Sequence, residues 1–186
     1  MYSLSDLASN TIVLRQLTPA DVTDQYVDWL NNPNINQYLE CRHSTHSLES
    51  VTQYVEALLA DDADEILMGI FDIQSQEHIG NIKLGPINSY HKHAPIGLVI
   101  GNEQYWGKGI ATTAIRLLTE AAVSKLGLQS LFAGCYSNNI GSYRAFLKAG
   151  WIFSGRFPGY WKNNDKSRND ELLLTYSGSH TLNIPP

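Results

Sequence analysis

The chain has 186 residues, of which 43% are hydrophobic and 17% are charged, so it can bury a core and does not belong to the disordered class. Its 13 Lys and Arg residues against 18 Asp and Glu residues leave a formal net charge of -5, which disfavours nucleic acid as a partner. We expect one domain over residues 1–186 in a cytoplasmic setting and no membrane association, because neither a signal peptide nor a long apolar run is evident.

Apolar periodicity and turn residues predict the elements in chain order. A strand at 11–17 comes first, followed by helices at 21–30 and 48–60. Three strands at 65–72, 78–84 and 94–101 form an antiparallel meander, and a long helix spans 110–125. A strand at 128–137, a short helix at 141–149 and strands at 151–156 and 171–176 complete the chain. This order predicts an α/β fold, in which a mixed sheet of about seven strands lies in three layers with a parallel crossover around the long helix.

A glycine-rich turn carries the strongest chemical signal in the sequence. Gly107 and Gly109 stand between the strand at 94–101 and the long helix. They remove the Cβ atoms that would keep a bulky anion from the backbone. The first turn of the helix then offers unpaired N–H groups and the positive end of its dipole. The segment therefore predicts a phosphate-binding turn, unless it merely joins a strand to a helix.

Two common phosphate motifs do not fit this turn. A P-loop needs four residues between its first glycine and Gly-Lys, followed by Ser or Thr, whereas five residues separate Gly101 from Gly107 and Gly109 follows Lys108. A dinucleotide fingerprint needs a third glycine where Thr112 stands. The two cysteines, Cys41 and Cys135, show no metal-ligand spacing, so no metal site is expected either.

The pattern Gln-x-x-Gly-x-Gly at 104–109 resembles the acyl-CoA pyrophosphate motif of the GNAT superfamily of acetyltransferases. A second motif agrees with it, since Asn139, a short helix and Gly150-Trp151 are similar to that family's later segment. The residues of the turn, Tyr105 to Gly109, most resemble those of the branch that acetylates ribosomal-protein N-termini and its small-molecule relatives. The resemblance implies a single acyl-CoA N-acyltransferase domain with a centrally splayed sheet, in which the strand at 96–100 carries a bulge and parts from the strand at 131–135.

The implied function is transfer of an acetyl group from acetyl-CoA to a primary amine, by direct attack in a ternary complex. The acceptor is a protein N-terminus, an amino sugar or a small amine, and the sequence does not choose among them. The residues that the resemblance assigns to the cofactor are Leu98, Val99, Ile100, Gln104, Trp106, Gly107, Lys108, Gly109, Ile110, Ala111, Thr112, Asn139, Ser142 and Phe146.

The catalytic residues are less clearly marked. Many family members use a tyrosine seven residues after the asparagine as proton donor, but Phe146 stands there and cannot donate. Ser142 matches the serine of the ribosomal-protein branch and is the expected acid, unless it only helps Asn139 to cap the short helix. Glu40 and Glu103 are the candidates for a base that removes the amine proton, and an amine that arrives neutral needs none.

Three classes of function stay open on the sequence. The first is an N-acetyltransferase, the second a non-catalytic acyl-CoA-binding module, and the third an interaction protein with a decayed cofactor site. Cofactor binding without turnover would favour the second class, and no binding at all the third. Tyr160 and Trp161 fit an acceptor wall, a homodimer contact or packing on the end of the sheet, and the sequence leaves these alternatives open.

Overall fold

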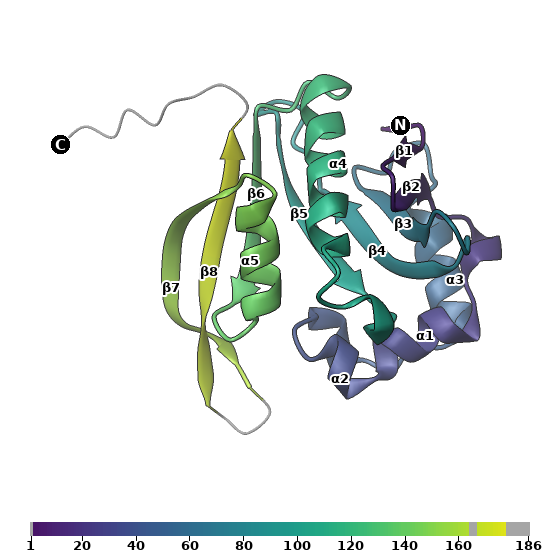
Figure 1. Cartoon of the computed structure of the whole chain (residues 1–186), viewed down its shortest axis with the longest axis horizontal. Coiled ribbons are helices and arrows are strands. Elements are labelled where there is room, and N and C mark those ends of the chain that lie inside the picture. The colour runs from purple at the N-terminus through teal and green to yellow at the C-terminus, as the bar shows by residue number, and fades with distance from the viewer. Residues whose placement is uncertain (1, 164–166, 178–186) are drawn as a thin grey trace.

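The computed structural model describes residues 2–163 and 167–177, in which one mixed sheet lies between two sets of helices (Figure 1). Its strands are β1 (Leu7–Ala8), β2 (Ile12–Gln16), β3 (Ile66–Asp72), β4 (His78–Leu84), β5 (His93–Ile100), β6 (Ser130–Tyr136), β7 (Ile152–Lys162) and β8 (Arg168–Ser177). Its α-helices are α1 (Asp24–Asn31), α2 (Pro33–Asn36), α3 (Leu48–Ala57), α4 (Ile110–Ser124) and α5 (Ile140–Lys148). Short 3-10 turns are η1 (Pro19–Asp21), η2 (Glu40–His43) and η3 (Glu103–Tyr105).

The sheet follows the order β1-β2-β3-β4-β5-β6-β8-β7. Its neighbouring strands pair antiparallel except β5 and β6, which are parallel because α4 crosses over between them. The parallel pairing is short: it joins three residues of β5, His93–Pro95, to three residues of β6, Ser130–Phe132. Beyond that point the two strands separate, and the sheet is split near its middle (Figure 1).

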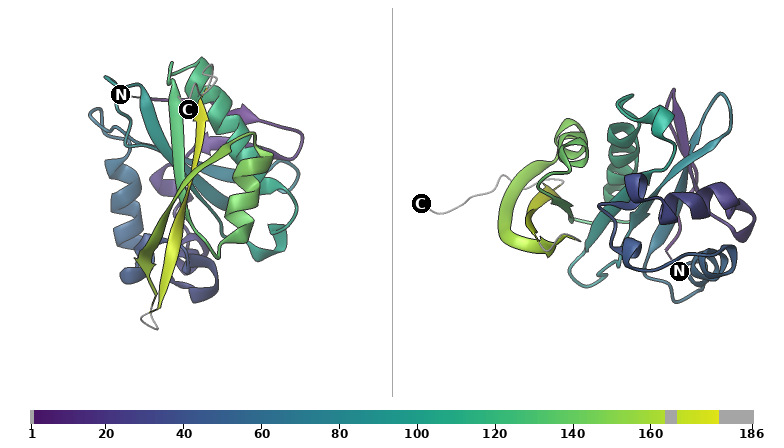
Figure 2. Two further views of the ribbon diagram at one scale, coloured as in Figure 1. Left: turned by 90° about the vertical axis from the view of Figure 1, so that its left-hand side faces the viewer. Right: turned by 90° about the horizontal axis from the view of Figure 1, so that it is seen from below.

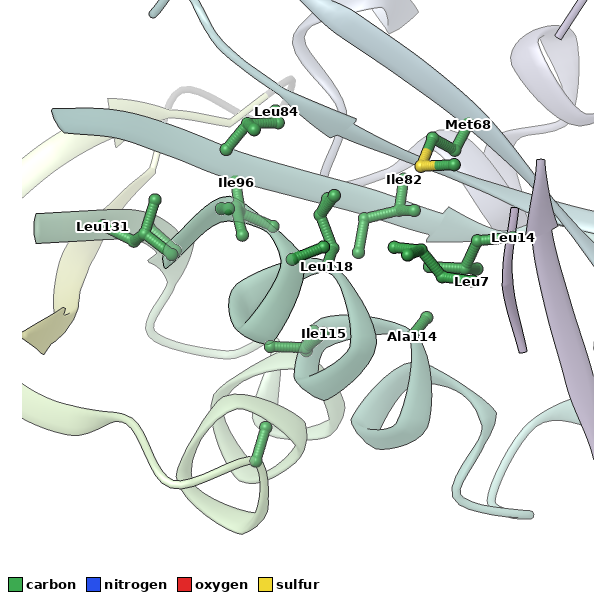
Figure 3. Packing of buried hydrophobic residues seen from close by; sticks show 14 of the residues in the cluster. Leu7, Leu14, Met68, Ile82, Leu84, Ile96, Ala114, Ile115, Leu118 and Leu131 are labelled. Atoms are coloured by element: carbon green, nitrogen blue, oxygen red, sulfur yellow. The ribbon is translucent and has the colours of Figure 1, made fainter. Parts of the chain in front are cut away.

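The long helix α4 packs on one face of the sheet and organises the larger core. Residues from its apolar stripe, Ala114, Ile115 and Leu118, meet Leu14 and Ile82 from the strands, and all five are fully buried (Figure 3). Burying a leucine or isoleucine side chain stabilises the fold by about 1.5–3 kcal/mol, so this stripe fixes α4 against the sheet. The N-cap of the helix, Gly109, has the left-handed conformation, and so does Gly127 beyond the end of the helix.

Helices α1 and α3 cover the other face with a second, smaller core (Figure 2). Trp29 of α1 and Val51 of α3 pack there against Phe71 of β3. The three layers are therefore α4 and α5, the sheet, and the helices α1 and α3. None of the helices in the described part of the chain is long and apolar enough to cross a membrane.

The predicted α/β class, the three layers and the parallel crossover are confirmed, and three details are corrected. The sheet has eight strands in the described residues, because β1 is a two-residue strand too short to show alternation. The last two strands are longer than expected and pair as a hairpin, in which β7 ends at Lys162 and β8 begins at Arg168. The bulge expected at 96–100 is absent from the pairing with β4, whose register runs unbroken from Ile96 to Ile100. The split therefore arises from β6, which leaves β5 after Phe132.

Candidate active site

Beyond Pro95, the edge of β5 that faces the split has no paired strand in the part of the chain that the structure describes. Pro95 accepts from Gly85, and Gly101 donates to Ile79 of β4, so both point to the β4 side. Because strand residues alternate in direction, the N–H and C=O groups of Leu98 and Ile100 point away from β4 and into the split, beyond the last paired residues Pro95 and Phe132. Unpaired strand edges require a hydrogen-bonding partner, and an extended amide-containing chain would supply one.

This alternation refines the residues expected to bind the cofactor. Leu98 and Ile100 present their backbone to the split, whereas the backbone of Val99 faces β4. The carbonyl of Ile100 already accepts a 2.8 Å hydrogen bond from Nε1 of Trp106. The indole thus ties the glycine turn to the end of β5, next to the open edge.

The glycine turn has the conformation and the space that an anion site needs. Gly107 and Gly109 have φ angles of 73° and 81°, which favour glycine because other residues are strained there. A Cβ atom built on either residue meets nothing within 4 Å, so the space beside the turn is open. Gly109 is the N-cap of α4 and provides no side-chain cap, which leaves the first N–H groups of the helix available for a phosphate.

The remaining residues of this segment divide between surface and core. Gln104 and Lys108 are exposed, and the Lys108 Nζ atom lies 5.4 Å from the ring centroid of Tyr105. Ala111 and Thr112 are half-buried in the first turn of α4, whereas Ile110 belongs to the core. Glu103 is exposed on η3, immediately before the turn.

At the start of α5, Asn139 caps the helix and leaves the hydroxyl of Ser142 out of the cap. The side chain of Asn139 caps the helix by accepting a 3.2 Å hydrogen bond from the backbone N–H of Ser142. The hydroxyl of Ser142 makes no hydrogen bond within residues 2–163 and 167–177, and its side chain is half-buried. One turn later, Phe146 is 2% exposed and packs on Trp151 with ring centroids 4.8 Å apart. Phe146 is thus a core residue in this structure and helps to fix α5 on the sheet.

A cavity of about 470 Å³ borders the carboxyl end of β6. It is lined by Glu40, Arg42, His43, Tyr136, Trp161, Lys162 and Asn163. The residues come from η2, β6 and the β7–β8 hairpin, so segments far apart in the sequence form it together. Glu40 is therefore in a cavity wall, while Glu103 lies outside the walls described for this cavity.

A hydrogen-bonded triad organises the wall of this cavity. The hydroxyl of Tyr136 donates to Oε1 of Glu40 at 2.6 Å and accepts from Nη2 of Arg42 at 2.6 Å. Nη1 of Arg42 lies 3.2 Å from the same Glu40 oxygen. Burial and the hydrogen bond to Glu40 raise the pKa of Tyr136 to about 12, so the phenol keeps its proton at neutral pH.

Aromatic rings complete the same wall. Tyr136 stacks on Trp161 with centroids 4.8 Å apart and planes 12° from parallel. The guanidinium carbon of Arg42 lies 5.1 Å from the Tyr136 ring centroid. Trp161 thus belongs to the cavity, which was one of the open alternatives, whereas Tyr160 is exposed beside it.

A second cavity of about 320 Å³ adjoins the first and shares Arg42 and Asn163 with it. Its lining is rich in amides and consists of Asn31, Pro33, Asn36, Gln37, Tyr38, Arg42, Asn138 and Asn163. Sequence reasoning did not identify Tyr136 or Asn163 as site residues. The signal for Tyr136 was available, because alternation along β6 puts its side chain on the face opposite to buried Cys135, three residues before Asn139.

The family model for the acetyltransferase (GNAT) domain matches residues 11–152 of the chain. Two proteins of Bacillus subtilis (strain 168) are similar in sequence. The uncharacterized N-acetyltransferase YoaA is 27% identical over 163 residues, which cover 85% of this chain and 89% of that protein. The probable N-acetyltransferase YjcK is 32% identical over 121 residues, which cover 61% of this chain and 65% of that protein.

Solved structures share the fold at lower sequence identity. RimL, a ribosomal α-N-protein acetyltransferase in complex with coenzyme A, is 19% identical with a TM-score of 0.82, over 93% of this chain and 98% of that one. A spermidine N-acetyltransferase from Vibrio cholerae in complex with CoA and spermine is 20% identical with a TM-score of 0.79, over 91% of this chain and 96% of that one.

Proposed function

The chain belongs to the GNAT acetyltransferase family and is an acetyl-CoA-dependent N-acetyltransferase, and we propose that it transfers the acetyl group directly to a primary amine while both substrates are bound. One observation carries the proposal. The open edge of β5 lies next to the uncapped N-terminus of α4, and the carboxyl end of β6, the other side of the split, borders a polar cavity. A donor and an acceptor can therefore approach one point from separate sites.

The donor site offers open space at the glycine turn and hydrogen-bonding groups that suit acetyl-CoA. The pyrophosphate would lie at Gly107 and Gly109, where the space is open and the helix N–H groups are uncapped. The amide-containing arm would pair with the free backbone of Leu98 and the N–H of Ile100. Acetyl-CoA supplies the acetyl group as a thioester, and every other requirement of the reaction falls on the side chains around it.

Glu40 removes the proton from the incoming amine, either directly or through a water molecule. An ammonium group has no lone pair, and a lysine-like amine has a pKa near 10.4, so most of it is protonated at neutral pH. Oε1 of Glu40 is engaged by Tyr136 and Arg42, whereas Oε2 accepts no hydrogen bond from the described residues and has His43 Nε2 at 3.7 Å. Oε2 is therefore the atom that accepts the proton as the new N–C bond forms.

Ser142 donates a proton to the departing sulfur as the C–S bond breaks. Its hydroxyl makes no hydrogen bond within the described residues, and Asn139 caps α5 through the backbone N–H of Ser142 instead. The residue that supplies a tyrosine hydroxyl in many relatives is here Phe146, which is buried in the core. Ser142 therefore takes the donor role that Phe146 cannot fill.

Calorimetric titration with acetyl-CoA tests the donor site. Gly109→Glu puts a carboxylate beside the pyrophosphate and should abolish binding, since like charges repel there. The matched control is Gly127→Glu, because Gly127 has a φ of 68°, open space at its Cβ position and a place at the other end of α4. Equal binding by both variants would contradict a donor site at this turn.

The buried Phe146 favours one alternative, a non-catalytic acyl-CoA-binding module. Colorimetric detection of the free CoA thiol separates the two, because a module binds acetyl-CoA and releases no thiol with any amine.

We further propose a single acyl-CoA N-acyltransferase domain in a reducing, cytoplasmic setting, which the free thiols of Cys41 and Cys135 support. A homodimer is also part of the proposal, supported by the exposed aromatic rings of Phe157 and Tyr160, and sedimentation equilibrium tests it.

A further inference from the structure

Arg42 is the cation that the two acceptor cavities share. Its side chain is only 10% exposed, although it lines both of them. A buried charge is costly unless it is paired and hydrogen-bonded, so the number of its donors that are satisfied matters.

The guanidinium group has more donors than the protein uses. Of its five N–H groups, one binds the carbonyl of Leu39 at 3.0 Å, one Glu40 at 3.2 Å and one the Tyr136 hydroxyl at 2.6 Å. The N–H of Nε and the second N–H of Nη2 have no partner among residues 2–163 and 167–177. Two adjacent guanidinium donors match the two oxygens of a carboxylate.

The charges around the two cavities also favour an acceptor that carries a negative group. The described lining holds two cations, Arg42 and Lys162, and one carboxylate, Glu40, which Arg42 already contacts. A polyamine carries several positive charges and would need several carboxylates, and it would be repelled by the two cations. An acceptor with its own negative group would instead be attracted to this wall.

We propose that the acceptor is an amine that also carries an oxyanion, which Arg42 binds while Glu40 receives the amine. This inference rests on the proposed acetyltransferase function and names its substrate class. The 3.2 Å contact between Nη1 of Arg42 and Oε1 of Glu40 holds the two side chains next to each other. The donors of Arg42 and the Oε2 atom of Glu40 that the described residues leave unused therefore suit an acceptor whose two charges are separated by only a few bonds. A free α-amino acid meets this condition, and so does a peptide whose N-terminal residues include an acidic side chain.

Matched acceptor pairs test the proposal through CoA-thiol release. Each free α-amino acid is compared with its α-carboxamide, the peptide amide Ser-Asp-Ala with Ser-Asn-Ala, and spermidine stands for the polyamines. We expect kcat/KM to be at least about tenfold higher for the oxyanion-bearing member of one series, because a charge-assisted hydrogen bond is lost in the other. The series that shows the preference identifies the source of the oxyanion.

Variants separate a binding role of Arg42 from a structural one. Arg42→Gln should lower kcat/KM for the oxyanion-bearing acceptor about 30-fold, mainly through KM, and remove the preference over the uncharged partner. If Arg42 had only a structural role, Arg42→Gln would lower kcat/KM equally for the oxyanion-bearing acceptor and for its uncharged partner. Lys162→Gln, at an exposed position, should reduce the preference about threefold. Lys125→Gln, at the C-terminal end of α4, removes the same charge and should leave the preference unchanged.

Each outcome decides between this inference and the proposed function. Equal kcat/KM within the matched pairs, or spermidine as the best acceptor, overturns the oxyanion-bearing class and leaves the acetyltransferase standing. Binding of acetyl-CoA with no thiol release for any amine overturns the proposed function, and the acceptor class falls with it.

Discussion

The phenol of Tyr136 donates a 2.6 Å hydrogen bond to Oε1 of Glu40, a residue 96 positions earlier in the chain. The bond joins the end of β6 to η2 and holds the Glu40 carboxylate in the cavity wall. Because burial and this bond raise the pKa of Tyr136 to about 12, the phenol stays a donor throughout the neutral range. Glu40 is thereby fixed through one oxygen and keeps the other for the amine.

Glu40→Gln should lower kcat/KM about 100-fold at pH 7, since general base catalysis contributes about 10²–10⁴-fold. The deficit should shrink as the pH rises, because the amine then loses its proton to water before it binds. The measurement is a pH–rate profile of CoA-thiol release between pH 6 and pH 10. The competing candidate is tested by Glu103→Gln, and a deficit that falls on this variant instead would assign the base to the exposed η3 carboxylate.

Ser142→Ala should lower kcat about 100-fold and leave the affinity for acetyl-CoA unchanged, because the hydroxyl acts on the departing sulfur and not on the bound donor. Asn139 should still cap α5 in this variant, since it accepts from the backbone of Ser142. Steady-state kinetics and calorimetry together check both statements. Ser124→Ala, at the end of α4, is the control for loss of a serine hydroxyl. Unchanged turnover by Ser142→Ala would remove the proton-donor role.

The ion pair between Arg15 and Asp21 makes stability depend on acid pH. Burial opposes the charge of Asp21, but hydrogen bonds from Arg15 and Thr18 outweigh it and hold the carboxyl pKa at about 2, below the ordinary 3.8. A lowered pKa stabilises the folded state above pH 4, and this stability is lost as the pH falls from about 4 to about 2.

Asp21→Asn removes this dependence. Between pH 6 and pH 3, the wild type should lose about 1 kcal/mol more unfolding free energy than the variant, an amount kept small because Arg15 is partly exposed. Urea unfolding at the two pH values provides the measurement. Asp28→Asn, an exposed carboxylate on α1, should lose stability in parallel with the wild type, and equal losses in all three proteins would contradict the role of the ion pair.

Gly97, within β5, and Gly101, immediately after it, should respond differently to alanine. A Cβ atom at Gly101 would collide with the indole of Trp29, which is buried between Tyr26 and His78 and cannot yield easily. Gly101→Ala should therefore cost about 1–3 kcal/mol of unfolding free energy. Gly97→Ala is the control, because nothing lies within 4 Å of its Cβ position, and it should be neutral or slightly stabilising. Denaturant midpoints at constant m-value compare the two, and equal effects would refute the collision.

The hairpin of β7 and β8 extends beyond the strands that the sequence patterns predict. Strand propensity ends near Phe157, because Pro158 and Gly159 are strand breakers. In the structure the strand continues through them to Lys162, with a register shift between Phe157 and Trp161. Gly159 has a φ of 58°, and its N–H donates to Asp170 of the partner strand at 2.6 Å. Pairing with β8 thus overrides the local signal, and it brings Trp161 and Lys162 to the cavity.

The sequence by itself determined the elements whose signals are local. The helix Ile110–Ser124 follows from its apolar stripe, and the turn before it from Gly107 and Gly109, since backbone conformation and helix polarity depend on neighbouring residues. Only the tertiary structure decided that Glu40 and Arg42 meet Tyr136 and that Trp161 closes the wall. Glu40 and Arg42 stand 96 and 94 positions before Tyr136, and Trp161 lies in the next strand but one along the sheet. Packing and strand pairing set the geometry of these contacts, which no local pattern encodes.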